Sequence, residues 1–333
     1  MRRWSAFLGA CMACGLASTV PFAAPAASGA EVAQSSRVTF QYHSNFLLNL
    51  HHFLLDIAAN ERDLAREVCP QEKNGIEIEI LRAAASTYRA RFAHKSLLFD
   101  PELFKIKETL SGDDARRSIG GLDLPPEVAD ALGTTAPIYE RCLWSAQDRS
   151  NRDWIAAVQA LDATYGAEIQ AGIEHDLAHE FTKDPVRVDV VVVTGDRNGA
   201  YTSDRPPHAV LPSGRADYQG LAALEMLYHE SSHVGVTDAV EAAIDAEITA
   251  THRPPDHSLW HAVQFYTVGA VVRNVLKEHG NLDYEPYAEK NGVYRGAWSD
   301  DKALIVKYWL PYLRGESDMA TAAKAMVDEL PPG

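Results

Sequence analysis

The sequence predicts an α+β protein that is mainly α, with a small mixed sheet in the middle of the chain. Apolar residues recur at helical spacing through most of the 333 residues. The exception is the segment 186–193, which is β-branched and reads as a strand. Two short candidate strands, 201–203 and 208–211, follow it after Gly- and Asn-containing turn signals. An apolar fraction of 46% and a charged fraction of 23% fit a globular protein with a sizeable core.

Helices are expected both before and after these strands along the chain. Residues 31–40 are expected to form a short tail, and residues 112–126 a loop. Apolar spacing and capping residues predict four helices before the strand, at 46–68, 76–93, 101–110 and 137–181; the last has a break near 150. After the strand they predict five helices, at 220–235, 238–251, 258–279, 301–313 and 318–330. We therefore divide the chain into residues 1–30, a helical region over 31–184 and a second region over 185–333.

Residues 1–30 have the layout of a secretory signal peptide. Arg2 and Arg3 precede an apolar stretch from Trp4 to Val20, and a small-residue tract ends at Ala30. The sequence therefore predicts an exported protein, periplasmic or secreted. A membrane connection is expected only through an uncleaved signal, or through a lipid on Cys11 in a lipobox-like Leu-Gly-Ala-Cys segment.

The charge of the exported chain limits its expected partners, and its cysteine content suggests a disulfide. Without the two arginines of residues 1–30, the remaining 29 basic and 46 acidic residues give a net charge of −17. Such a chain is a poor partner for nucleic acid, so we expect no nucleic-acid binding. Cys69 and Cys142 remain after cleavage, and an even pair in an exported protein suggests one disulfide, with two buried free thiols as the alternative.

The residues that carry chemistry are His229-Glu230-Ser231-Ser232-His233, an H-E-x-x-H motif on a predicted helix. Residues at i and i+4 share one helix face, so both imidazoles can reach one metal ion. Glu230 directly follows His229 on the helix and can act as the general base toward a metal-activated water. At motif level, residues 221–235 resemble the zincin metallopeptidases.

The resemblance implies one Zn²⁺ per chain and a sheet before the motif helix, whose edge strand pairs with the substrate backbone. The nearest candidate for that edge is the segment 208–211. A metzincin assignment is excluded, because Val236 and Ala239 stand where that subclass has Gly and His. The gluzincin-like pattern places a third ligand on a later helix, where Glu241 and Glu247 are available.

A further candidate for the third ligand comes from the residues themselves. His261 lies between Trp260 and an apolar run, where a buried imidazole needs a metal or a polar partner. We select His229, His233 and His261 as the metal ligands and keep His257, Glu247 and Glu241 as alternatives. For stabilising an oxyanion the candidate is Tyr294, with Tyr266 as the second choice.

Two other functional classes remain open. Asp176 and His179 form a carboxylate-x-x-His pair like that of Glu230 and His233, and two such pairs build di-iron sites in four-helix bundles. The second alternative is a secreted, catalytically silent binding protein. The favoured hypothesis is an exported zinc metallohydrolase that acts on a peptide or a small acyl substrate.

Overall fold

The structure is a computed structural model that describes residues 37–60, 64, 75–195, 199–254, 258–295 and 298–330. It confirms a mainly helical α+β fold with a small mixed sheet. The proposed signal peptide, Cys69 and His257 lie outside the described residues. Cys142 is disulfide-bonded. Among the described helices, none has the length and apolar character needed to cross a membrane.

Four strands form one sheet in the order β1-β2-β4-β3. Strand β1 (Phe40–His43) pairs in parallel with β2 (Val186–Val191), and β2 pairs in parallel with β4 (His208–Pro212). The last strand, β3 (Tyr201–Ser203), pairs with β4 in the antiparallel direction and forms one edge. β1 was not expected, because residues 31–40 were interpreted as a tail. The prediction that residues 208–211 form the edge is wrong, because β4 lies between β2 and β3.

Each face of the sheet contributes to its own hydrophobic core. One core contains Val188, Val190 and Leu211, whereas the other contains Val191 and Val210. This alternation follows from the two-residue period of a strand, and burial on both faces explains why four of the six residues of β2 are valine. The described residues from Arg37 to Leu330 all belong to one compact unit.

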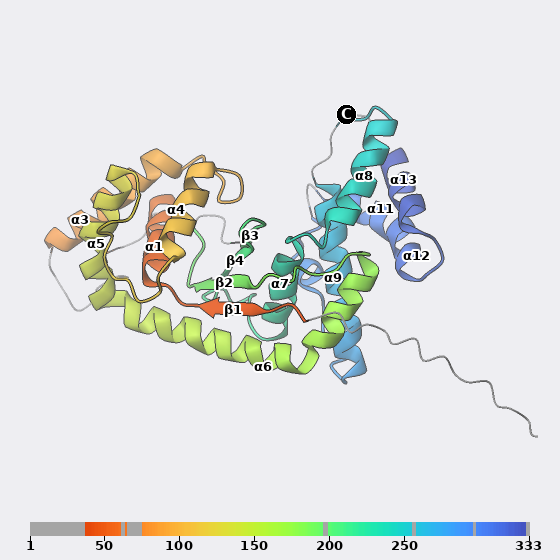
Figure 1. The fold of residues 1–333 in the computed structure, drawn as a ribbon, viewed down its shortest axis with the longest axis horizontal. Helices are drawn as coiled ribbons and strands as arrows, with labels where there is room; N and C mark the ends of the chain where they lie inside the picture. The colour runs from red at the N-terminus through yellow and green to blue at the C-terminus, as the bar shows by residue number, and fades with distance from the viewer. Residues whose placement is uncertain are drawn as a thin grey trace, which may run out of the picture. The chain divides into compact units, whose positions relative to one another are not determined.

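The helices of the first half pack on one side of the sheet (Figure 1). They are α1 (Phe46–Ala59), α3 (Gly75–Phe92), α4 (Pro101–Ser111) and α5 (Pro126–Tyr139). A π-helical turn at Glu140–Trp144 leads into the 32-residue α6 (Ser145–Asp176), which runs uninterrupted through the break predicted near 150. At about 1.5 Å per residue α6 is ~48 Å long, and its buried apolar residues belong to the core that contains Val188 and Val190. Figure 1 shows α6 passing beneath the whole sheet.

In the second half, α7 packs against the sheet, and the later helices pack around α7, α8 and α9 (Figure 1). The motif helix is α7 (Leu221–Ser232), followed by α8 (Asp238–Ala250) and α9 (Leu259–Glu278). The chain ends with short helices and one π-helical turn: α10 (Tyr287–Lys290), α11 (Ser299–Leu304), η2 (Ile305–Trp309), α12 (Leu310–Leu313) and α13 (Met319–Asp328). Trp309 is fully buried and donates its indole N–H to the hydroxyl of Thr267 on α9 at 2.8 Å.

A buried ionic network ties the sheet to α4. His208 of β4 is fully buried and places one ring nitrogen 2.8 Å from Asp189 and the other 2.9 Å from Glu108 of α4. Arg187 donates to both carboxylate oxygens of Asp189. Burial alone would raise the pKa of Asp189, but hydrogen bonds and charge from His208 and Arg187 lower it. The buried carboxylate is therefore compensated, and it links two neighbouring strands to the helix above them.

Candidate metal centre

Helix α7 presents two imidazoles on one buried face. Gly220, with φ +58°, precedes the helix, and Gly235, with φ +81°, follows it, so both ends use backbone conformations that favour glycine. His233 is the C-cap residue and keeps helical angles of φ −62° and ψ −19°. It therefore lies one turn beyond His229, and the two ring centroids are 5.0 Å apart. The spacing that the sequence implied is present.

His261, in the first turn of α9, completes a cluster of three imidazoles. Its ring centroid lies 5.0 Å from that of His233 and 5.4 Å from that of His229. One potential ligand atom from each residue lies within 4.8 Å of the others, and the Nε2 atoms of His229 and His261 are 3.4 Å apart. Nitrogens bound to tetrahedral zinc at about 2.05 Å would be about 3.3 Å apart. The spacing of this pair matches that expected around zinc, and the three histidines together could hold a metal ion.

All three imidazoles favour the neutral form, which is the form that binds metals. Burial, followed by the charges of His233 and His261, lowers the pKa of His229 well below its usual value. Burial and the charge of His261 lower the pKa of His233 to about 3, and burial lowers that of His261 to about 4. Lone pairs are therefore available at neutral pH without the release of a proton from the rings.

Glu230 points from α7 toward the edge strand. Its Oε2 accepts a hydrogen bond of 2.7 Å from the hydroxyl of Thr202, the middle residue of β3. Burial raises the pKa of Glu230 to about 7, although this hydrogen bond acts in the opposite direction. Burial, followed by the charge of Glu230, also raises the pKa of Tyr218 to about 12. Sequence reasoning missed Thr202 and Tyr218, because nothing local indicates which strand residue faces the motif helix.

Aromatic rings enclose the imidazole cluster. Phe265 stacks on His229 with ring centroids 3.6 Å apart. Trp260 stacks on His261 at 5.3 Å, and Trp298 meets the same ring edge-on at 5.0 Å. These contacts restrict the rotation of two imidazoles and exclude water from their flanks. The run Trp260-His261 and the nearby Phe265 were visible in the sequence, but the approach of Trp298 was not.

Gln264 links α9 to the motif helix from behind the cluster. Its fully buried amide donates to the carbonyl oxygen of His229 at 2.9 Å and to the hydroxyl of Ser232 at 2.8 Å. In the described part of the chain, the Nδ1 atom of His229 and the Oε1 atom of Gln264 are both buried without a hydrogen-bond partner. An imidazole that binds metal through one nitrogen usually donates from the other. Gln264 therefore fixes the backbone of the motif helix at His229, and no described side chain bonds the Nδ1 atom of the ring.

Glu225 anchors the start of the motif helix, one turn before His229. It accepts hydrogen bonds from the hydroxyl of Tyr284 at 2.6 Å and from the backbone N–H of Tyr287 at 3.0 Å. Burial raises the pKa of Glu225 to about 7, although these two hydrogen bonds act to lower it. This carboxyl group therefore ties α7 to the segment that follows α9.

The alternative ligands Glu241 and Glu247 do not join the cluster, and His257 lies outside the described residues. Among the described residues, only His229, His233 and His261 form a group able to share a metal ion, so Glu241 and Glu247 lie outside it. Tyr294 is buried, and its hydroxyl donates to the carbonyl of Ala262 at 3.4 Å. That partner gives no support to the predicted oxyanion role of Tyr294.

The second predicted carboxylate–histidine pair does not converge with the first. Asp176 is the last residue of α6 and lies 2.8 Å from the ring of its exposed neighbour His175. His179 lies beyond the helix and is exposed, with Nδ1 2.9 Å from the carbonyl oxygen of Glu180. Neither Asp176 nor His179 belongs to the metal-binding group found among the described residues. The described geometry therefore gives no support to a di-iron bundle.

Comparison of the chain with protein-family models, with curated proteins and with solved structures found no match.

Proposed function

We propose that the protein is an exported zinc-dependent hydrolase, with a peptide as the favoured substrate and another acyl bond as the broader class. The observation that carries the proposal is the convergence of His261, from a separate helix, on His229 and His233, with the buried residue Glu230 directly after His229 in the motif helix. Two histidines one turn apart are common on helices. A third imidazole within ligand distance, in an aromatic enclosure and next to a buried carboxyl group, is typical of a hydrolytic metal centre.

The side chains have separate roles in this proposal. His229, His233 and His261 would hold the ion, which supplies Lewis acidity toward a carbonyl group and a water molecule. Glu230 accepts the proton of that water and later passes it to the leaving group. Thr202 holds the Glu230 carboxyl group in place by its hydrogen bond. Phe265 and Trp260 keep the imidazoles oriented and the flanks of the site dry.

The test compares zinc content and hydrolysis across matched variants of the mature chain. The unchanged protein is expected to bind about one zinc per chain. His229→Ala, His233→Ala and His261→Ala are each expected to lose the metal, because two ligands rarely hold a zinc ion in competition with a chelator. His179→Ala is the control, since that histidine is exposed and lies outside the cluster.

Glu230→Gln separates catalysis from metal binding. It should retain zinc and should lose cleavage of internally quenched peptides by about 100-fold or more, since it removes the general base. Undiminished hydrolysis by Glu230→Gln would disprove the proposed mechanism. Zinc bound without any hydrolysis by the unchanged chain would favour the silent binding protein, and two irons per chain would favour the bundle alternative.

A further inference from the structure

The imidazole cluster is more exposed on one side than on the other. His229 and Glu230 are buried, with 1% and 4% of their surface exposed, whereas His233 and His261 are partly exposed. A substrate that reaches an ion shared by the three imidazoles therefore approaches over His233 and His261. The side chains that border these two rings are the ones that the substrate contacts.

Trp260, in the first turn of α9, borders both of the partly exposed imidazoles. Its indole stacks on the ring of His261 with centroids 5.3 Å apart and an interplanar angle of 26°. It also meets the ring of His233 edge-on, with centroids 5.8 Å apart. Trp260 is itself only partly buried. The indole therefore lies beside two of the proposed ligands, on the more exposed side of the cluster.

Trp298, the residue before α11, approaches the same cluster from another direction. Its ring centroid lies 5.0 Å from that of His261 at an interplanar angle of 70°, and 5.8 Å from that of Phe265. Trp298 is also partly buried. One indole is thus nearly parallel to the His261 ring and the other is steeply inclined to it. Together they offer two partly exposed aromatic surfaces next to the ligand that α9 supplies.

The surroundings of the partly exposed imidazoles carry little charge in the described part of the chain. Burial alone lowers the pKa of His261, and burial with the charge of His261 lowers that of His233. No described carboxylate or ammonium group therefore acts strongly on either ring. Gln264, a polar neighbour, is fully buried and bonds the motif helix. Uncharged, aromatic surroundings favour an apolar group over a charged one or a sugar, whose polar atoms need partners.

The two indoles are suited to hold an aromatic or large aliphatic group. Aromatic pairs are stabilised in offset-stacked and edge-to-face arrangements with centroids about 4.5–7 Å apart. Trp260 and Trp298 already make such contacts with His261, so their rings are held in place before a substrate binds. Ring side chains with few rotatable bonds provide a large contact area at a small loss of conformational entropy.

We propose that Trp260 and Trp298 form the specificity subsite of the metal centre, and that this subsite selects substrates with an aromatic or large aliphatic group next to the bond that is cleaved. The inference rests on the proposed hydrolase function and names the substrate class of that site.

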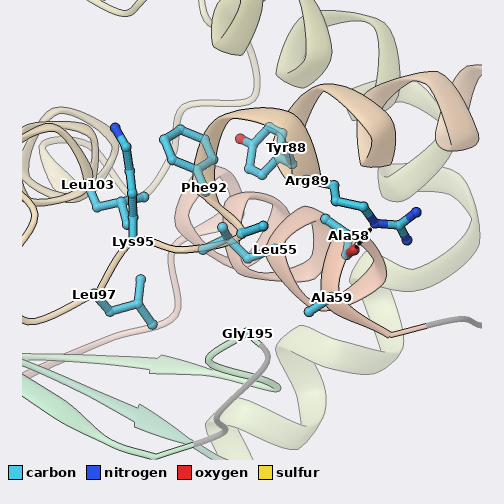
Figure 2. A pocket seen from close by; sticks show the side chains of 11 residues that line it. Leu55, Ala58, Ala59, Tyr88, Arg89, Phe92, Lys95, Leu97, Leu103 and Gly195 are labelled. Carbon is cyan, nitrogen blue, oxygen red and sulfur yellow. Dashed lines mark hydrogen bonds between the residues drawn. The ribbon is translucent and has the colours of Figure 1, made fainter.

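An apolar cavity elsewhere in the molecule is the competing location for such a group. This cavity of about 260 Å³ is bounded by Leu55 of α1, by Phe92 of α3 and by Leu97 of the following segment (Figure 2). None of its lining residues belongs to the imidazole cluster, and neither indole lines it. Ala93 also lines the cavity and is exposed, so Ala93→Phe fills this space without disturbing the metal centre.

The experiment uses hydroxamates, which bind zinc through one common group and differ only in the group attached to it. Calorimetry with the zinc-loaded protein compares acetohydroxamate, phenylacetohydroxamate and the monohydroxamate of succinate. The phenyl compound is expected to bind about tenfold or more tightly than the other two, the factor that follows from burying one aromatic ring. In quenched peptides, Phe or Leu beside the cleaved bond should raise kcat/KM over Asp or Lys by a similar factor.

Variants of the two indoles locate the preference. Trp298→Ala should lower the preference for the phenyl compound below about threefold, while zinc content and acetohydroxamate affinity persist. Trp298→Phe should keep most of the preference, because an aromatic ring remains. Trp260→Ala is expected to act in the same way as Trp298→Ala; if it loses zinc through the release of His261, the Trp298 variants decide. Ala93→Phe is the control and should keep the whole preference.

Three results would overturn the subsite. They are equal affinities for phenylacetohydroxamate and acetohydroxamate, a preference that is unchanged in Trp298→Ala, and a preference that is lost in Ala93→Phe, which would place the phenyl group in the remote cavity. Zinc binding with a Trp298-dependent preference, but without hydrolysis of any peptide, would instead reject the proposed hydrolase and leave the subsite standing. The failure of the subsite and the failure of the proposed function are therefore distinguishable.

Discussion

Replacing Glu225 by Gln is expected to stabilise the protein at neutral and alkaline pH. Burial raises the pKa of this carboxyl group from the usual 4.5 to about 7. Between these values the unfolded chain is ionised while the folded protein keeps the proton. The folded state therefore binds more protons, and the free energy of unfolding falls as the pH rises through this window. The difference corresponds to about 3 kcal/mol, fully expressed above pH ~7.

The Gln side chain removes the ionisation but retains an acceptor for Tyr284 and for the Tyr287 N–H. Urea unfolding with a chelator present, at pH 4.5, 6, 7 and 8, measures the effect without a contribution from metal binding. The variant should match the unchanged protein near pH 4.5 and exceed it by up to about 3 kcal/mol at pH 8. Exposed Glu79→Gln is the control. Identical pH slopes for Glu225→Gln and the unchanged protein would refute the reasoning.

Two further predictions concern the metal site and the sheet. Gln264→Leu should lower zinc affinity by about 10- to 100-fold in a chelator competition, because the motif helix loses the hydrogen bonds to His229 O and Ser232 Oγ that fix it against α9. Unaltered affinity would show that packing alone positions His229. Asp189→Asn should cost about 3–5 kcal/mol in urea unfolding at pH 7, and the difference should shrink as acid protonates the native carboxylate, whose pKa is lowered. Asp123→Asn is the control, because Asp123 forms an exposed ion pair with Lys105 and its replacement should lower the free energy of unfolding by at most about 1 kcal/mol. If both variants lost the same free energy of unfolding, burial of Asp189 would not explain its effect.

Local sequence determined the elements and part of the site. The valine run of β2 and the helical spacing of α3, α4, α7 and α9 predicted their positions to within a few residues, because period and capping are local properties. The i, i+4 spacing of His229 and His233 likewise needs only one turn of helix. The placement of His261 in an apolar run led to its selection as third ligand, since a buried imidazole needs a partner.

Only the tertiary structure decided which distant segments meet. Residues 40–43 become a strand because β2 offers an unpaired edge, which no local pattern in a four-residue segment reveals. In the same way β4 becomes internal, and β3, with Thr202, becomes the edge that faces Glu230. Gln264 and Trp298 reach the imidazoles through the packing of α7 against α9 and the return of the chain before α11. Spacing along the chain fixes neighbours within one helix or strand, whereas contacts between elements depend on burial shared by the whole core.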